Sequence, residues 1–551
     1  MDKYERVIEL AKRRGFLWPS FEIYGSTAGF WDFGPLGAAL KRRIEDLWRD
    51  FYVIGEGFYE IETPTMGIED VFVASGHVSS FVDLMVECKK CGEAFRADLV
   101  QEKCPECGGS LGDAYAFNLM FKTSIGPGSQ RIGYLRPETA QGMFVDFHRL
   151  LRFYRDKLPF GVAQMGKVYR NEISPRQGVL RLREFTIAEA EIFIDPRERE
   201  HPRFDDVEDV MLRLYPVKEQ VGKGSMLELS VKDAIDRGIV AHQFMGYHIA
   251  LIQLFLLGIG ISPEKLRFRQ HKEDERAHYA VDCWDAEALT DRFGWIELVG
   301  IADRGDYDLK AHAKHCQTEM TVFVPYEQPI TKERTVIKPN MSAIGRKFKD
   351  KAAKIVGVLR TLSMEQLEEG VIQFEGETIP LTKDLVEYGH VTEEVRGERV
   401  MPHVIEPSYG IDRIVYALLE HSFEEERIED ETRIVLRFPP NIAPVQAAVL
   451  PLLSRDGLDE KAREIEHSLR KSGLLVDYDD SGTIGRRYRR HDEIGTPFAI
   501  TIDHQTLEDE TVTIRERDTM RQIRVRIKDL SGVMVGLVAG DVAFESAGTL
   551  I

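Results

Sequence analysis

GVAQMGKVYRNEISPRQGVLRLREFTIAEAEIFID, residues 161–195, is the stretch that decides how this chain folds. It predicts two β-strands, roughly Val162–Glu172 and Leu182–Ile194, because apolar and aromatic residues recur on both sides of a turn-rich segment. The connecting loop contains Ser174, Pro175 and Gly178, which are typical turn residues. We therefore expect an antiparallel hairpin here.

One face of this hairpin is chemically unusual. Because side chains alternate between the faces of a strand, Arg170 and Glu172 share a face of the first strand. The corresponding face of the second strand carries Arg183, Phe185, Ile187 and Glu189. Arginine binds phosphate through paired N–H groups, and an aromatic ring offers a platform for a base. The pattern predicts a nucleotide site built on strands; the alternative is a solvated hairpin with paired surface charges.

The order R-x-E, loop, R-x-F resembles motif 2 of the class II aminoacyl-tRNA synthetases. That resemblance implies an α+β fold in which helices flank an antiparallel sheet. It also directs attention to two further motifs, one on each side of the hairpin in the sequence.

The segment before the hairpin resembles motif 1 of the same family. Phe33–Gly37 predicts a turn, and a helix with an apolar stripe follows to about Val53. The strand FYEIETP then ends at Pro64. In the family this motif builds a dimer interface, so the resemblance implies a homodimer.

The segment Val404–Arg413 resembles motif 3. A strand, Gly410 and an apolar-faced helix follow one another, and Arg413 lies in the first helical turn, beside the positive end of the helix dipole. Gly410 is expected to let the chain turn from strand into helix. Before this motif, Trp295–Ala302 predicts a strand with the charged exit Asp303-Arg304.

Two short sequences make the resemblance more specific. RPETAQG, residues 136–142, and EPSYGIDR, residues 406–413, are close to motifs of the glycyl-tRNA synthetases of the archaeal and eukaryotic single-chain type. The resemblance covers essentially the whole chain. It implies a ligase that activates glycine with ATP and transfers it to the 3′ end of tRNA(Gly).

The resemblance also implies roles for individual residues. Arg170 would hold the α-phosphate of ATP, Arg183 and Arg413 would hold the outer phosphates with Mg²⁺, and Glu172 would accept from the adenine amino group; these four are the expected catalytic residues. The expected ATP-binding residues are Arg170, Asn171, Glu172, Leu180, Arg183, Glu184, Phe185, Glu297, Leu298, Gly410 and Arg413, with Phe185 stacked on adenine and Glu297 on Mg²⁺. The expected glycine-binding residues are Arg96, Glu138, Phe185, Glu189, Arg304, Glu406, Ser408 and Gly410.

Cysteines cluster in CKKCGEAFRADLVQEKCPECGG, residues 88–109. Cys88, Cys91, Cys104 and Cys107 form two C-x-x-C pairs, and a glycine follows the second cysteine of each. This spacing predicts a tetrahedral Zn²⁺ site, and four thiolates leave no open position for water, so the site should be structural. The alternative is a reduced loop without metal.

Composition limits the class of protein. The 551 residues carry 73 basic and 92 acidic side chains, a formal net charge of −19, which argues against indiscriminate nucleic-acid binding. The charged start of the chain lacks a signal-peptide core, and the most apolar run, Ile249–Ile261, is too short to span a bilayer. We expect a cytoplasmic protein with no membrane partner.

The length predicts several domains. We expect a class II catalytic domain over residues 1–430, with a zinc-binding insertion at 88–107 and an inserted subdomain at about 313–395. Residues 434–551 resemble the α/β anticodon-binding domain of related synthetases, and RIVLRFPPNIAPVQAAVLPLL predicts a strand, a proline-rich turn and a helix. Arg486–Arg490 interleaves arginines with Tyr488, which suits either RNA phosphate and base contact or a helix surface.

Two alternative functions remain open at this stage. A sister synthetase would charge another small amino acid, and RPETAQG and EPSYGIDR argue against it. A non-catalytic accessory protein would keep the fold for binding only, and it would not need Arg170, Glu172, Arg183 and Arg413 together.

Overall fold

The computed structural model describes residues 1–128, 131–175, 178–222, 224–276, 280–360, 370–382, 384–428 and 431–551. The chain divides into two compact units, one formed by Met1–Met320 with Met401–Ile551 and the other by Thr321–Val400. Among the described residues, no helix combines the length and the apolar character needed to cross a membrane.

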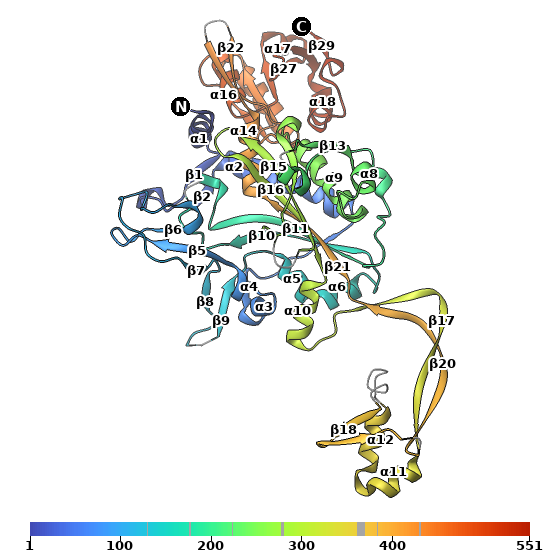
Figure 1. Ribbon diagram of the computed structural model, residues 1–551. Coiled ribbons are helices and arrows are strands. Elements are labelled where there is room, and N and C mark those ends of the chain that lie inside the picture. Colours follow the sequence, from blue (N-terminus) through green and yellow to red (C-terminus); the bar gives the residue numbers. More distant parts are fainter. Residues whose placement is uncertain are drawn as a thin grey trace. The chain divides into compact units, whose positions relative to one another are not determined.

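A nine-stranded sheet runs through the first unit in the order β13-β12-β14-β15-β16-β21-β11-β10-β3 (Figure 1). Among its described strands only β3/β10 and β12/β14 pair in parallel. The strands are β3 (Tyr59–Glu60), β10 (Phe160–Tyr169), β11 (Glu184–Ile194), β12 (Met211–Tyr215), β13 (Leu227–Ser230), β14 (Leu266–Gln270), β15 (Asp282–Thr290), β16 (Gly294–Gly305) and β21 (His403–Gly410).

Alternation along β11 gives the sheet two different faces. Ala188, Ala190, Ile192 and Ile194 belong to the main hydrophobic core. Residues between them, including Glu189 and Glu191, point to the opposite face. The period of two in AEAEIFI therefore separates the core from a polar face.

Helices cover the core face. α2 (Pro35–Arg49), α9 (Gln243–Gly258) and α14 (Ile411–Ser422) pack there, and α1 (Lys3–Arg14) packs on α14. α9 is buried almost all round, as its uniformly apolar sequence predicts. α2 begins at Pro35 and continues as a π-helix, Asp50–Gly55. The predicted antiparallel sheet flanked by helices is confirmed.

Shorter helices lie on the polar side of the sheet. α5 (Ala140–Val145) contacts β11, and α10 (Tyr307–Cys316) contacts α5. Other small elements of the first unit are β1 (Leu17–Pro19), β2 (Trp31–Phe33), α6 (Phe147–Phe153), α7 (Val217–Gly222) and α8 (Val231–Asp236).

Residues 66–135, called here the cysteine-bearing segment, form two small sheets. Their strands are β5 (Val82–Glu87), β6 (Ala94–Arg96) and β7 (Tyr115–Asn118) in one, and β4 (Met66–Ile68), β8 (Lys122–Ser124) and β9 (Ile132–Leu135) in the other. The helices α3 (Glu69–Ala74) and α4 (His77–Ser80) stand between β4 and β5. Ile173 packs with Met85 and Leu119, so this segment supports the loop of the β10–β11 hairpin.

The second unit contains a long antiparallel pair and a small core. β17 (Val322–Pro339) pairs with β20 (Val386–Val400). The compact part is formed by α11 (Met341–Phe348), α12 (Ala352–Arg360), β18 (Val371–Phe374) and β19 (Glu377–Pro380). Its core includes Ile344, Ile355 and Ile372. Residues 307–316, part of which fell within the insertion expected at about 313–395, form α10 of the first unit.

The C-terminal part has its own mixed sheet in the order β25-β24-β26-β27-β28-β29 and its own core. Its strands are β24 (Ala447–Pro451), β25 (Val476–Tyr478), β26 (Phe498–Ile502), β27 (Thr511–Glu516), β28 (Gln522–Arg526) and β29 (Thr549–Leu550), and the hairpin β22 (Phe423–Ile428) and β23 (Glu431–Leu436) precedes it. Its helices are α15 (Leu458–Lys471), α16 (Ile484–Glu493), α17 (His504–Asp509) and α18 (Ile527–Ala539).

One predicted element of this part is wrong. Residues 447–451 were expected within a helix, but they form β24, which is parallel to both of its neighbours. All five residues are buried, because a central parallel strand is covered on both faces.

Candidate active site

The predicted hairpin is present, and its strands are shorter than expected. β10 ends at Tyr169 and β11 begins at Glu184, so Arg170, Glu172 and Arg183 lie just beyond the paired strands. The amide of Arg170 still donates to the carbonyl of Arg183 at 3.0 Å, whereas that of Asn171 turns away and donates to the carbonyl of Leu119 at 2.6 Å. The chain therefore opens into a loop over the sheet.

A cavity lies under this loop. It is lined by Arg170, Glu172, Val179, Leu180, Arg181, Leu182, Phe185, Ile187, Glu297, Leu298, Ser408, Gly410, Asp412 and Arg413. Arginines from the hairpin and from α14 thus meet around one hollow, together with Phe185 and two carboxylates from the expected ATP set.

Arg170 is positioned by aromatic rings and one carbonyl. Its guanidinium lies 5.3 Å from the ring centre of Phe185 and 5.5 Å from that of Phe81, and its Nε donates to the carbonyl of Pro137 at 3.3 Å. These contacts leave the planar guanidinium donors available for an anion.

Arg413 and Glu297 pair with each other at the cavity. Arg413 Nη1 lies 2.8 Å from the Glu297 carboxylate, and Arg413 Nε donates to the carbonyl of Leu180 at 3.1 Å. The two side chains are partly exposed, so a charged ligand can reach both.

Not every predicted ATP residue lines the cavity. Arg183 donates instead to the carbonyls of Ala28 at 2.6 Å and Glu172 at 3.0 Å. Asn171 and Glu184 are likewise absent from the described lining, and Glu184 pairs with Lys167 at 3.5 Å. The roles expected for these three residues stay predictions.

Arg181 is a lining residue that the sequence analysis missed. Its Nε lies 3.5 Å from Glu172. The sequence R-L-R at 181–183 could have indicated it, because residues two positions apart in a strand lie on the same face, so both arginines could point into the site. The real strand begins only at Glu184, so alternation could not decide between them.

A buried polar bridge joins the hairpin to α14. Lys41 pairs with Asp412, and its Nζ donates to the Thr186 hydroxyl at 2.7 Å. The amide of Thr186 donates to Asp412 at 3.2 Å. This bridge fixes the start of α14, and with it Arg413, against β11.

The backbone conformation of Gly410 differs from the expectation. Its φ is −78°, which other residues adopt readily, so the turn into α14 does not require glycine. A β-carbon there would lie 3.4 Å from the carbonyl of Leu298.

Glu189 connects the cavity to a second, buried group of carboxylates. The hydroxyl of Ser408, which lines the cavity, donates to Glu189 Oε1 at 2.7 Å. The amide and hydroxyl of Thr139 donate to Oε2 at 2.7 and 2.5 Å. Three donors to one carboxylate fix its orientation.

Arg304 is the centre of the buried group. With 1% of its surface exposed, it donates to Asp308 at 2.8 Å, to Glu406 at 2.7 Å and to Glu138 at 3.4 Å. Burial raises the pKa of Glu138, whereas the charges of Arg304 and His77 lower it. The lowering is larger, so the net pKa of Glu138 is below its usual value. Burial, with the charges of Glu189 and Glu138, raises the pKa of Glu406 to about 8 in spite of Arg304.

Glu191 is a further member that the sequence analysis did not select. It lies two residues beyond Glu189 on the same face of β11 and is completely buried. Burial first, and then the Glu406 charge, raises its pKa well above the usual range. The alternation A-E-A-E could have identified it together with Glu189.

Arg96 lies apart from this group. Its guanidinium pairs with Asp83 at 2.8 Å and with Asp98 at 3.0 Å, both within the cysteine-bearing segment. Its expected contact with glycine stays a prediction.

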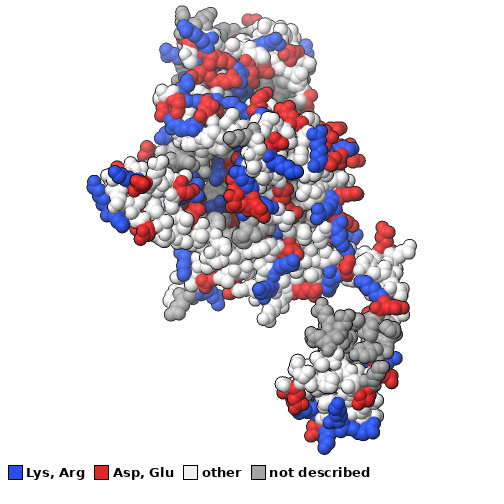
Figure 2. Space-filling model, in the orientation of Figure 1, with Lys and Arg blue, Asp and Glu red and all other residues white. Residues whose placement is uncertain are grey.

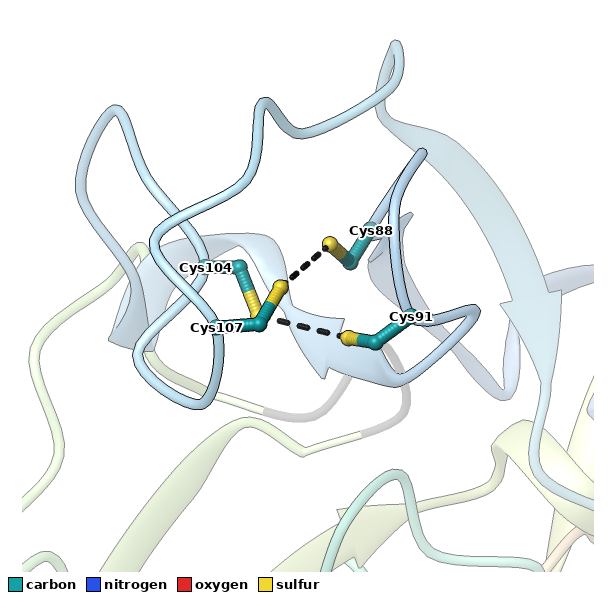
Figure 3. A group of neighbouring side chains, drawn as sticks. All are labelled: Cys88, Cys91, Cys104 and Cys107. Atoms are coloured by element: carbon teal, nitrogen blue, oxygen red, sulfur yellow. Dashed lines mark hydrogen bonds between the residues drawn. The ribbon is translucent and has the colours of Figure 1, made fainter.

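The four clustered cysteines converge as predicted (Figure 3). Cys88 Sγ lies 3.5 Å from Cys107 Sγ, and Cys91 Sγ lies 3.7 Å from Cys104 Sγ. Thiolates on a tetrahedral zinc ion stand roughly 3.8 Å apart, as follows from a Zn–S bond of about 2.3 Å. Backbone amides of Cys91 and Lys90 lower the pKa of Cys88 to about 6, which favours the thiolate form. The donor set fits zinc.

A second polar group lies on the other side of Glu297. His271 Nε2 lies 2.6 Å from Asp285, and Cys283 is close to both. A β-carbon on Gly300 would lie 3.6 Å from Glu297 Oε1 and 3.8 Å from Asp285 Oδ1, so these two carboxylates flank one backbone position. The His271–Asp285 pair thus borders the Glu297 end of the cavity.

The basic run in the C-terminal part is largely used within the protein. Arg487 is buried and donates to carbonyls of Asp480 and Gly482 at 3.0 and 2.8 Å, and Arg490 pairs with Asp479. Among the arginines of this run, Arg486 is exposed, whereas Arg489 and Arg490 are partly buried. On the face seen in Figure 2, acidic and basic side chains are interspersed.

Comparisons with known proteins agree with this arrangement. The family "tRNA synthetase class II core domain (G, H, P, S and T)" matches residues 123–422, more than half of the chain, and the family "Anticodon binding domain" matches residues 446–537. The first match contains the hairpin, Arg304 and α14. The second covers most of the C-terminal sheet.

Curated relatives align along the whole sequence. The glycine–tRNA ligase of Methanothrix thermoacetophila is 55% identical over 100% of this chain and 99% of its own length. The glycine–tRNA ligase of Archaeoglobus fulgidus is 52% identical over 97% of each chain, and that of Methanocaldococcus jannaschii is 51% identical over 96% of this chain and 98% of its own. The chain therefore belongs to the class II tRNA synthetases and, among them, to the glycine–tRNA ligase family.

Proposed function

We propose that this protein activates glycine with ATP and transfers it to tRNA(Gly), with the cavity under the hairpin as the ATP site and the adjoining carboxylates as the glycine site. One observation carries the assignment of the sites. Ser408 lines the arginine-bearing cavity and also donates to Glu189 of the buried carboxylate group, at 2.7 Å. A nucleotide in the first site and an ammonium in the second would therefore be neighbours.

In the activation step the glycine carboxylate attacks the α-phosphate, the bond to the bridging oxygen breaks, and pyrophosphate leaves in line. The protein has little covalent work here; it positions the reactants and neutralises charge that spreads over phosphate oxygens. Arg170 is suited to the α-phosphate, since it lines the cavity and its Nε is held by the carbonyl of Pro137. Arg413 is suited to the outer phosphates, and Glu297 would hold Mg²⁺, which supplies further charge neutralisation.

The buried cluster of carboxylates is suited to an ammonium ion. Glu138, Glu189 and Glu406 are all buried on one side of the sheet, and Arg304 donates to two of them, Glu406 and Glu138. An added ammonium would balance part of this negative charge. Since glycine has no side chain to grip, selectivity must come from walls that exclude a β-carbon, and no editing domain is required.

Two other functions are less well supported. A sister synthetase would need space for a larger amino acid beside Ser408 and Gly410. A non-catalytic accessory protein would have no reason to keep Arg170, Arg413 and Glu297 around one cavity. Formation of dinucleotides from the adenylate would be a side activity of the same site.

Zinc is proposed as a structural component at Cys88, Cys91, Cys104 and Cys107, where it would order the segment that supports the hairpin loop. We also propose a homodimer, on the strength of the motif 1 resemblance, and a cytoplasmic location. The proposed domain boundaries remain 1–430 and 434–551, with the insertion at about 313–395. Light scattering at micromolar concentration tests the dimer, because a monomer would contradict it.

Pyrophosphate exchange with each of the twenty amino acids tests the proposed function. Glycine alone should support exchange, and charging of tRNA should then follow with the full chain. Exchange supported by alanine, serine or proline in place of glycine would favour the sister synthetase. No exchange with any amino acid, in a protein that binds ATP, would favour the accessory protein.

A further inference from the structure

Glu191 carries a carboxyl group that nothing in the described structure stabilises by hydrogen bonding. Its side chain has no exposed surface, and neither Oε1 nor Oε2 has a hydrogen-bond partner among the described residues. A buried carboxylate ion without donors is strongly disfavoured, so the group requires either a proton or a cation.

Glu406 faces Glu191 from the neighbouring strand. In the antiparallel pair of β11 and β21, Glu189 stands opposite Ser408 and Ile192 stands opposite Ile405, which places Glu191 opposite Glu406. Side chains directly opposite each other have Cβ atoms roughly 4.5–5.5 Å apart, and two like charges in that position repel. The two carboxyl groups therefore cannot both ionise without further positive charge.

The surroundings supply too little positive charge. Glu189 lies on the same strand, Asp308 reaches in from α10, and Glu138 reaches in from the residues before α5. β10 contributes the uncharged Gln164 at the position opposite Glu189. The facing cation is Arg304, which is shared among Asp308, Glu406 and Glu138; beyond these groups, Arg136 acts on Glu189 and His77 on Glu138.

The position of Arg304 distinguishes the two facing carboxyl groups. Glu406 accepts a hydrogen bond from Arg304 at 2.7 Å, which favours its ionised form. Glu191 receives none. Burial and mutual repulsion raise the pKa of both groups, that of Glu406 to about 8, so one proton belongs to the pair at neutral pH. This difference in hydrogen bonding favours Glu191 over Glu406 as the carrier of the proton.

We propose that Glu191 and Glu406 share one proton in the free protein. We further propose that this proton passes to solvent when the ammonium group of glycine binds among the carboxylates of Glu138, Glu189 and Glu406. Charge is conserved in the step, because the ammonium replaces the proton as the positive charge of the pair. Glu191 would thus be a specificity residue that makes the pocket select a cation. The inference rests on the proposed function, namely that these carboxylates bind glycine.

Calorimetric titration of glycine into the full-length protein tests the proposal. Titrations at pH 7.5 in phosphate, HEPES and Tris, whose ionisation enthalpies differ, give the number of protons released from the slope of the observed enthalpy. Wild type should release close to one proton per glycine. Glu191→Gln should release almost none, while Glu228→Gln, a matched change on β13 outside the site, should behave as wild type.

A pH profile provides a second readout that loss of packing would not change. In pyrophosphate exchange, the KM of wild type for glycine should rise about tenfold for each unit that pH falls below the pKa of the pair, because protons compete with the ammonium. For Glu191→Gln the profile should be flat over the same range. Thermal unfolding of both variants checks that they fold.

The outcomes separate this inference from the proposed function. If wild type catalyses glycine-dependent exchange but releases no proton on binding glycine, the inference is overturned and the proposed function stands. Both measurements use wild type, so this outcome does not depend on the folding of the variant. Equal release by wild type and Glu191→Gln would also overturn it. Absence of exchange with glycine would instead overturn the proposed function.

Discussion

Arg413 lies 2.8 Å from the carboxylate of Glu297, so a side chain suited to phosphate and a side chain suited to Mg²⁺ neutralise each other. The pair stands where β16 and α14 meet, at the wall of the arginine-bearing cavity. In the proposed function, an ATP–Mg²⁺ complex would carry both charges and would take over both partners. The pair leaves its two charged groups accessible for this exchange.

Arg413→Lys should impair ATP use far more than it impairs folding. Lysine keeps the charge but loses the planar set of donors that contacts Glu297 and the carbonyl of Leu180 together. We expect kcat/KM for ATP in pyrophosphate exchange to fall about 10²-fold. Arg521→Lys is the control, since Arg521 forms an exposed pair with Glu545 in the C-terminal part. Equal losses in both variants would contradict a role for Arg413 at the phosphates.

Glu189→Gln should weaken glycine use more than ATP use. The amide cannot accept from Thr139 and Ser408 in the way the carboxylate does, and it removes a negative charge from the proposed ammonium site. We expect the KM for glycine to rise about tenfold or more, as loss of a charged hydrogen-bond partner implies, while the KM for ATP changes little. An unchanged KM for glycine would remove Glu189 from this role.

Much of the site follows from alternation, and the sequence is least informative where alternation stops. Glu189 and Phe185 lie within β11 and were placed on the correct face by a period of two. Arg183 precedes the strand, and its guanidinium turns toward the carbonyls of Ala28 and Glu172. Sequence cannot show where hydrogen bonding between strands ends, because that depends on the partner loop around Leu119.

The wrong prediction at β24 has a different cause. AAVLP is short and apolar throughout, so its period does not distinguish a buried helix from a buried strand. Its parallel neighbours, β25 and β26, are separated from it by helices, and only the assembled sheet shows that both of its faces are covered. Glu191 was missed for a related reason, since the importance of its burial appears only when β21 brings Glu406 opposite.

Cys91→Ser should remove zinc and weaken ATP binding indirectly. Loss of one of four thiolates lowers zinc affinity steeply, and the small sheet β6-β5-β7 should then lose the order that zinc is proposed to supply. Because Ile173 packs with Met85, the hairpin loop should become more mobile and the KM for ATP should rise. Metal analysis should give close to one zinc per chain for wild type and for Cys316→Ser, an exposed cysteine outside the cluster, and far less for Cys91→Ser. Full zinc content in Cys91→Ser would contradict the assignment.

His248 should make the protein sensitive to acid. It is completely buried on α9 beside Tyr52, neither ring nitrogen has a partner among the described residues, and burial lowers its pKa to about 3. Because the folded-state pKa is lower than the value of about 6.5 in an unfolded chain, the unfolded state binds the proton first, and stability falls as pH drops from about 6.5 toward 3. The loss from this group should reach about 2 kcal/mol at pH 5.

His248→Leu should remove that part of the pH dependence. Chemical unfolding at pH 7.5 and pH 5 should show a smaller loss of stability in His248→Leu than in wild type. The control is His504→Leu at an exposed position of α17, which should keep the wild-type difference. A wild-type difference retained in His248→Leu would assign the acid sensitivity to another group.

Arg304→Met should be the most destabilising of these substitutions. Methionine fills much of the same volume, but it leaves the carboxyl groups of Asp308, Glu406 and Glu138 without their shared cation in a buried setting. Removal of one partner from a buried ion pair typically costs about 3–5 kcal/mol, so the unfolding free energy at pH 7.5 should fall by that amount. Lower pH should restore part of the loss, because protonation neutralises the stranded carboxylates, and equilibrium unfolding at pH 7.5 and 6 measures this recovery. Arg267→Met, which breaks a less buried pair with Glu287 on the same sheet, should cost less and recover less. A similar loss at both pH values in Arg304→Met would mean that packing around Phe144, and not charge, is what Arg304 supplies.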